Sequence, residues 1–116
     1  MSVIRDARQI AASAGVTNLV AGSKFEFLAR NSVVEVFACQ DTADDGTVLL
    51  DVSFGNLLEG DALAVPTFTA EFGPDRDKHK LISAIAQAGD RLQLKVANTD
   101  AVNVTNLRTL ITITSV

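Results

Sequence analysis

An acidic loop is the first segment of the chain whose residue types could do chemistry. Residues 41–46 read Asp-Thr-Ala-Asp-Asp-Gly, and clustered carboxylates are the ligands that calcium prefers. The EF-hand register fails, because aligning Gly46 with the glycine of that loop puts Ala43 and Val52 where oxygen ligands are required. Another kind of calcium site stays open, beside the simpler interpretation of a solvated hairpin turn built from Asp and Gly.

The only histidine, His79, stands in the most charged segment, residues 75–80. A serine triad would recruit Ser83 with Asp75 or Asp77, but triads are assembled from distant segments that the fold orients. The sequence has no Gly-x-Ser-x-Gly nucleophile elbow. One histidine and one cysteine also cannot supply a closed zinc site. We therefore expect no catalytic residue, no metal and no cofactor, and we interpret the segment as an exposed loop.

The other residues that could do chemistry are expected to pack in the core or to face solvent. Glu59 and Asp61 would suit glycoside hydrolysis only at a defined separation, and beside Gly60 in a loop we expect both to be exposed. Cys39 lies in an apolar run and is expected to pack as a small hydrophobe. The chain has 6 Phe and no Trp or Tyr. All of these Phe fall in strand-like runs, so we expect them in the core rather than in a sugar-binding platform.

Composition narrows the class of protein further. A chain of 116 residues with 47% hydrophobic residues suits one globular domain. The net charge of −4 and the pI of about 4.7 disfavour binding to nucleic acid or to an anionic membrane. A single cysteine is compatible with a reducing compartment. Charged residues stand at positions 5, 6 and 8, where a signal peptide would be apolar. No apolar run approaches the length of a membrane span.

Alternating apolar residues predict a series of short strands from residue 24 onward. Residues 81–89 also fit a helical face, but a strand is favoured because Gly89-Asp90 then makes a turn. The stretch 55–67 carries two glycines and a proline and is expected to be a loop. The regular spacing indicates an all-β fold, a single antiparallel β-sandwich or jelly-roll-like domain over residues 21–116. Its expected strands cover 24–30, 33–40, 47–54, 67–72, 81–88, 91–96 and 107–114.

The first twenty residues differ in character from the rest. Apolar residues recur at near-helical spacing before Gly15, at Ile4, Ala7, Ile10, Ala11 and Ala14. Such a stretch is marginal as an isolated helix, so an extended arm that orders against a partner is the alternative. We expect residues 1–20 to be an N-terminal arm or short helix.

Two features of the last third of the chain concern binding. Asn98, Asp100, Asn103 and Asn106 fill a loop whose side chains are expected to bond to the local backbone, and the flanking strands could belong to opposite sheets. The outer row of the last strand is only weakly polar, and interface centres are depleted in charge. The expected partner-binding residues are therefore taken from the arm and this row: Ile4, Ile10, Leu110, Thr112 and Thr114.

The chain resembles the small cement (decoration) proteins of tailed-phage capsids. The resemblance consists of the opening segment MSVIRDARQIAASAGVTN, a compact β-sandwich, and the ending GDRLQLKVANTDAVNVTNLRTLITITSV. It implies a non-enzymatic protein of the virion that is assembled in the host cytoplasm. Such a protein binds the major capsid protein on the outside of an icosahedral head, stabilises the shell, and associates with itself as a homotrimer or homodimer. No individual functional residue is carried over from the family.

Two further expectations follow. If the first segment is an arm, deleting residues 2–15 should weaken binding to the shell without unfolding the sandwich. The alternative function is a jelly-roll module that recognises a carbohydrate or calcium through its loops.

Overall fold

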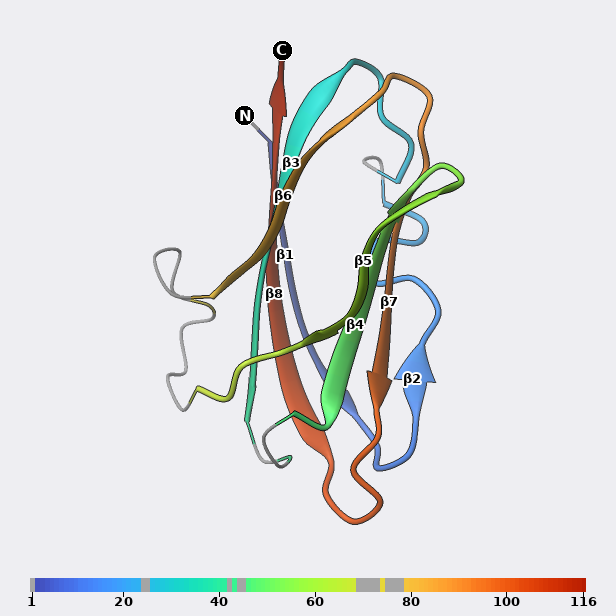
Figure 1. Cartoon of the computed structure of the whole chain (residues 1–116). Helices are drawn as coiled ribbons and strands as arrows, with labels where there is room; N and C mark the ends of the chain where they lie inside the picture. The colour runs from blue at the N-terminus through green and yellow to red at the C-terminus, as the bar shows by residue number, and fades with distance from the viewer. Residues whose placement is uncertain (1, 24–25, 42, 44–45, 69–73, 75–78) are drawn as a thin grey trace.

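The protein is all-β, with two sheets packed face to face. A computed structural model describes residues 2–23, 26–41, 43, 46–68, 74 and 79–116, and within these residues it contains no helix. The strands form two four-stranded antiparallel sheets, sheet A in the order β1-β8-β3-β6 and sheet B in the order β2-β7-β4-β5 (Figure 1). Their bounds are β1 Ser2–Ile10, β2 Gly15–Val16, β3 Ser32–Asp41, β4 Val48–Phe54, β5 Leu57–Ala64, β6 Lys80–Ala86, β7 Leu92–Asn98 and β8 Thr105–Ser115.

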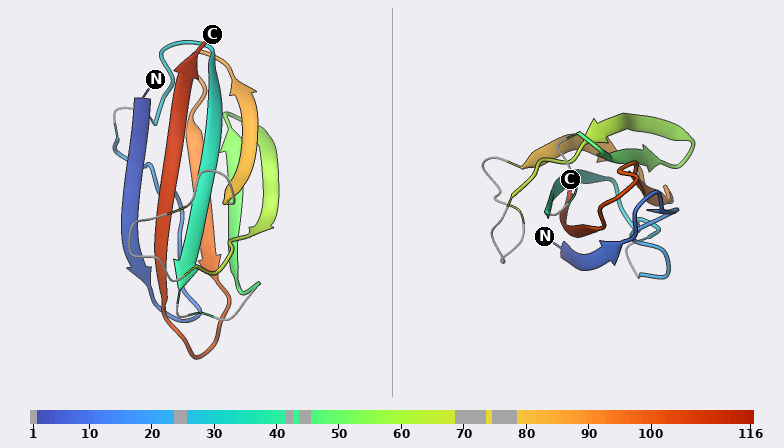
Figure 2. Two further views of the ribbon diagram at one scale, coloured as in Figure 1. Left: turned by 90° about the vertical axis from the view of Figure 1, so that its left-hand side faces the viewer. Right: turned by 90° about the horizontal axis from the view of Figure 1, so that it is seen from below.

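The strand order has a simple logic. Four of the ladders pair β1 with β8, β2 with β7, β3 with β6, and β4 with β5, as in one long hairpin that has been rolled up. This is the connectivity of a jelly roll. Figure 2 shows sheet A from its outer side, with β8 between β1 and β3. The expected β-sandwich is confirmed, and β7 and β8 belong to opposite sheets.

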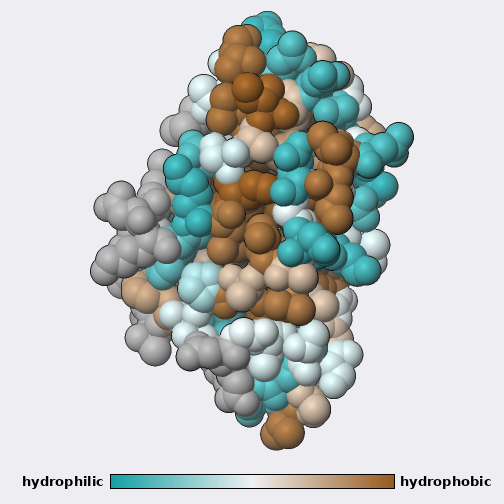
Figure 3. Space-filling view, in the orientation of Figure 1, coloured by the Kyte–Doolittle hydropathy of each residue, from teal (hydrophilic) through white to brown (hydrophobic). Residues whose placement is uncertain are grey.

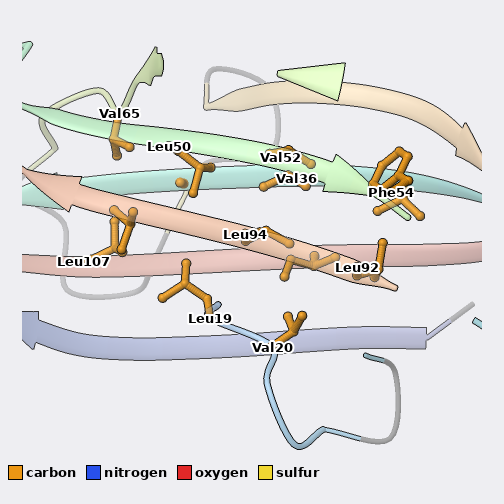
Figure 4. Packing of buried hydrophobic residues seen from close by; sticks show 14 of the residues in the cluster. Leu19, Val20, Val36, Leu50, Val52, Phe54, Val65, Leu92, Leu94 and Leu107 are labelled. Carbon is orange, nitrogen blue, oxygen red and sulfur yellow. The ribbon is translucent and has the colours of Figure 1, made fainter. Parts of the chain in front are cut away.

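The core lies between the sheets and follows the alternation of the sequence. On β4 the burial alternates strictly, so that Val48, Leu50, Val52 and Phe54 face sheet A. The inner residues of β7 and β8 meet them in one cluster (Figure 4). Each fully buried Val, Leu, Ile or Phe side chain contributes about 1.5–3 kcal/mol to folding relative to exposure. The principal partners from β7 and β8 are Leu92, Leu94, Val96, Leu107, Ile111 and Ile113.

Strand β3 is buried on both faces, as its apolar pattern predicts. Val34 and Val36 belong to the core cluster, while Phe37 and Cys39 are buried on the outer face of sheet A. Burial raises the pKa of the Cys39 thiol, which keeps it neutral. The expectation that Cys39 packs as a small hydrophobe is therefore confirmed.

The N-terminal segment is an edge strand of sheet A, which corrects the expected helix or arm. β1 pairs with β8 along its whole length, from Ser2 opposite Ile113 to Ile10 opposite Thr105. Ile10 is buried in the core, and Ile4 packs against it. The spacing of the apolar residues fits a helix equally well, so the pairing decides the structure. A tertiary ladder overrides a weak local preference here.

Strand β5 occupies a stretch that the sequence predicts to be a loop. Its ladder with β4 shifts register twice, between Leu50 and Val52 and between Val52 and Ser53. At one of these bulges Ala62 has a φ of 51°, and its N–H donates to Asp51 Oδ1 at 2.6 Å. Bulges break the alternation by which a strand is recognised in a sequence.

The run 24–30 is not a regular strand over its described residues. It contributes an isolated bridge between Phe27 and Arg91, and the Phe27 side chain is 60% exposed, against the expectation that it lies in the core. Phe37 and Phe54 are buried as expected, and Phe68 is half-buried. The expected strand 67–72 lies mostly outside the described residues, as do Phe25 and Phe72.

The side of the sandwich between β1 and β2 is closed by residues 17–20. Leu19 and Val20 are buried in the core. The Asn18 amide donates to the carbonyl of Leu92 at 3.0 Å, and its Oδ1 accepts from the N–H groups of Val20 and Leu94, both at 3.1 Å. This side chain holds the segment on β7 where the two-residue strand β2 ends.

Each edge strand carries a feature that hinders pairing with a further strand. On β1, Asp6 and Arg8 point into the sandwich, where Arg8 Nε donates to Asp6 Oδ2 at 2.7 Å. Strand β2 has two residues, and β5 is bulged twice. The ladder to β6 shifts between Val36 and Phe37 of β3. Short strands, inward charges and bulges are devices by which natural sheets avoid edge-to-edge association.

Acid should loosen the segment that leads into β3. The pKa of the Glu26 carboxyl is lowered, first because the Gly22 N–H donates to Oε1 at 2.8 Å and next because Arg91 Nε donates to Oε2 at 2.7 Å. A lowered pKa means that Glu26 stabilises the fold fully above its unfolded pKa of about 4.3, and that this contribution disappears as the pH falls through the folded value. Glu26→Gln should therefore be less stable than wild type at pH 7 and lose less stability on acidification. Urea unfolding followed by circular dichroism between pH 7 and pH 3 measures the free energy of unfolding of both proteins. If the free energies of wild type and variant fell in parallel with pH, Glu26 would not stabilise the fold through its charge.

Candidate functional site

The histidine segment does not form a triad within the described residues. His79 is buried, and its ring meets that of Phe68 edge to face, with 4.6 Å between the ring centroids. Its carbonyl accepts the N–H of Ala38 at 3.1 Å. Ser83 is exposed on β6, while Asp75 and Asp77 lie outside the described residues. The described part of this segment thus packs against β3, against the expectation of a fully exposed loop.

The acidic loop is described only in part. Asp41 accepts a hydrogen bond from the Asn106 amide at 2.8 Å and lies 4.0 Å from Arg108 Nη1. Residues 42, 44 and 45 lie outside the description. The described residues contain no group of three or more side chains that could hold a metal ion. Whether this loop binds calcium stays an open prediction.

The loop between β7 and β8 is held by the side chains of Asn98 and Asp100, as its sequence predicts, whereas Asn106 lies in β8 and bonds to Asp41 instead. The buried Asn98 amide donates to the carbonyls of Ala11 at 3.2 Å and Asn103 at 3.0 Å. Asp100 Oδ1 accepts from the N–H groups of Val102 at 2.9 Å and Asn103 at 3.0 Å. The polar groups of this loop therefore serve its turns and its attachment to the first segment.

Most of the predicted partner-binding residues are not accessible. Ile4 and Ile10 face the core. Leu110 and Thr112 do project from the outer face of sheet A, as predicted, but each is only 2% exposed. Thr114 is exposed on that face. The surface available for docking therefore lies toward the end of β8 and excludes the first strand's isoleucines.

The long side of the sandwich between β5 and β6 lies opposite the side between β1 and β2 and exposes apolar side chains. Leu57 is 62% exposed and Ile85 is 66% exposed. Figure 3 shows hydrophobic side chains gathered on this side of the molecule between borders of hydrophilic ones. Partly buried residues that pack against the core also come from these two strands, namely Leu63, Leu81, Ile82 and Ala84.

A hollow of about 410 Å³ opens on this side, between the β4–β5 turn and the segment that joins β6 to β7. Its apolar lining comes from Phe54, Leu57 and Ile85. Two carboxylates, Glu59 and Asp90, also line it. The polar residues Asn56 and Gln87 complete the lining. We call these residues the β5–β6 hollow.

The β5–β6 hollow continues onto the outer face of sheet A. Ile85 lies opposite Val33, and Val33 lies opposite Thr114 on its other side. Val33 is half-buried and Thr114 is exposed. Thr114, the accessible member of the predicted set, is therefore connected to the hollow by a row that runs through the apolar Val33 and Ile85.

Sequence reasoning missed Leu57 because it assigned 55–67 to a loop. One signal was present: Leu57 and Leu58 are adjacent in the sequence, and neighbouring residues of a strand point to opposite faces. The core between the two sheets can cover only one of them, so the other faces outward. Both are in fact exposed, because β5 is an edge strand with bulges.

No family model matches the chain, and no curated protein matches it. Among the described residues there is no helix that is long and apolar enough to cross a membrane.

Proposed function

We propose that the protein is a non-enzymatic structural protein of a virion, a cement or decoration protein that binds the outside of an icosahedral phage capsid. The observation that supports docking is the exposed apolar surface around Leu57 and Ile85 on the side between β5 and β6. Exposed apolar patches with polar borders are typical of protein interaction sites. The choice of a capsid as partner rests on the sequence resemblance.

Cementing a shell needs contacts and rigidity rather than reactive groups. A stable interface buries about 800 Å² on each partner. Many copies on one shell add avidity, so each contact can be modest. The major capsid protein is the proposed partner. Self-association as a homotrimer or homodimer stays part of the proposal, and analytical ultracentrifugation measures it directly.

Capsid binding should depend on the apolar side chains of the β5–β6 hollow. In the variant Leu57→Ser/Ile85→Ser we expect binding to heads that lack the protein to weaken at least about tenfold, because truncated anchor residues commonly cost more than 1 kcal/mol each. The measurement is co-sedimentation of the purified protein with the heads over a range of concentrations. Both side chains are largely exposed, so the thermal transition should stay near that of wild type.

Val102→Ser is the matched control, since Val102 is 82% exposed but lies in the loop between β7 and β8 at the other end of the sandwich (Figure 1). It should bind as wild type does. If the double variant binds the heads as tightly as wild type does, the hollow is not part of the docking surface. A wild-type protein that stays in the supernatant would contradict the capsid proposal itself.

A further inference from the structure

The β5–β6 hollow combines apolar walls with negative charge. Leu57 and Ile85 form exposed walls, and the buried Phe54 also lines the hollow. Glu59 and Asp90 are its titratable residues, and its lining contains no lysine, arginine or histidine. None of the ion pairs within the described residues involves either carboxylate. The hollow therefore presents negative charge without an internal counter-ion.

The local backbone fixes the Asp90 carboxylate in place. Asp90 Oδ2 accepts the N–H of Gln87 at 3.0 Å, and the Asp90 N–H donates back to the Gln87 carbonyl at 3.1 Å. Its Oδ1 lies close to Gly55, where an added Cβ would come within 3.0 Å. Glu59 is the extra residue of the bulge between Val52 and Ser53. Asp90 is thus held in the turn that leads into β7, and a bulge of β5 presents Glu59.

The same bulges decide how a partner can bind. Adding a strand to β5 would need a regular row of N–H and C=O groups, and two register shifts interrupt that row. Recognition at this edge therefore relies on side chains. The volume of about 410 Å³ lies within the range of 300–1,000 Å³ that is typical of binding pockets.

We propose that the β5–β6 hollow binds a segment of a partner protein in which a lysine or arginine stands beside apolar residues. The apolar side chains would pack against Leu57 and Ile85, while the cation pairs with Glu59 and Asp90. Opposite charges across an interface favour the right partner and reject like-charged ones. The inference rests on the docking role proposed above, and it names the chemistry of the partner surface that this role requires.

The test uses two synthetic peptides and the whole protein, without capsids. The probe is acetyl-Ala-Leu-Lys-Leu-Ala-amide, and its control has glutamate in place of the lysine. Binding is followed by methyl NMR of protein labelled at leucine and isoleucine. We expect the lysine peptide to shift the Leu57 and Ile85 signals and to bind about three- to tenfold more tightly than the control, because each exposed pair contributes modestly. Added salt should reduce that preference.

The matched variant is Glu59→Gln/Asp90→Asn, which keeps the size and one acceptor oxygen of each side chain but removes both charges. It should bind the two peptides equally. Should the double variant fail to fold, Glu59→Gln alone is expected to lose part of the preference. Equal binding of both peptides to wild type, or shifts away from Leu57 and Ile85, would overturn the inference. Peptide preference without binding to heads would instead refute only the capsid role.

Discussion

A protein lacking residues 2–10 should no longer fold cooperatively. These residues form the whole of β1, whose ladder covers one side of β8 and places Ile10 in the core. Without them β8 becomes an exposed edge beside an open core. A domain of this size has a net stability of about 5–15 kcal/mol, which the loss of an entire strand exceeds. Circular dichroism during urea unfolding measures the effect, and it suits a chain that has no Trp or Tyr.

Point variants test the same strand with the fold retained. Ile10→Ala should lower the free energy of unfolding by about 2–5 kcal/mol, because it leaves a cavity in the core. Val3→Ala, on the outer face of the same strand, should change it by about 0.5 kcal/mol. A truncated protein that melted like the full chain would restore the interpretation of this segment as an arm.

The first strand also shows where sequence reasoning stops. Strands β3, β4, β7 and β8 lie in the middle of their sheets and could be predicted, because each turns alternate residues into the core and those positions are apolar. An edge strand escapes this constraint. Strand β1 directs Asp6 and Arg8 inward, where they pair with each other. Strand β5 has two bulges. The inward charges and the bulges both interrupt the alternation of apolar and polar residues. The sequence of β1 therefore resembles that of a helix, and the sequence of β5 that of a loop.

Replacing Asn98 by alanine should lower the free energy of unfolding by about 2–4 kcal/mol. The buried Asn98 amide joins three parts of the chain, donating to the carbonyls of Ile10, Ala11 and Asn103, while its Oδ1 accepts the N–H of Asp100 at 3.1 Å. Alanine removes all of these bonds and leaves buried polar groups without a partner, which costs about 1–3 kcal/mol for each group. Urea unfolding at pH 7 gives the difference.

The variant Asn98→Asp separates hydrogen bonding from size. At pH 7 its carboxylate would place negative charge against the carbonyl oxygens that now accept from the amide, so it should be less stable than Asn98→Ala. This arrangement raises the pKa of the new carboxyl in the folded state, and a raised pKa stabilises the fold as the pH falls. The stability of Asn98→Asp relative to wild type should therefore improve from pH 7 to pH 4. A constant difference would show that the amide acts only through its shape.

The candidate site could be predicted only in part. Thr114 was identified from the weakly polar outer row, and it is exposed. Leu110 and Thr112 belong to the same row but are buried, and a strand pattern cannot reveal what covers its outer face. The hollow was missed because it joins residues of β5 and β6 with the turns beside them. Such a site exists only once the two sheets are packed, so local sequence carries little trace of it.

The position of β8 in sheet A also sets the order of events during synthesis. β8 is the neighbour of both β1 and β3, although it is the last of these strands along the chain. Two of the three ladders of sheet A must therefore wait until the ribosome has made residues 105–115. Pairing across such distances takes milliseconds to seconds in β-sandwiches, and an incomplete sheet is prone to aggregate meanwhile.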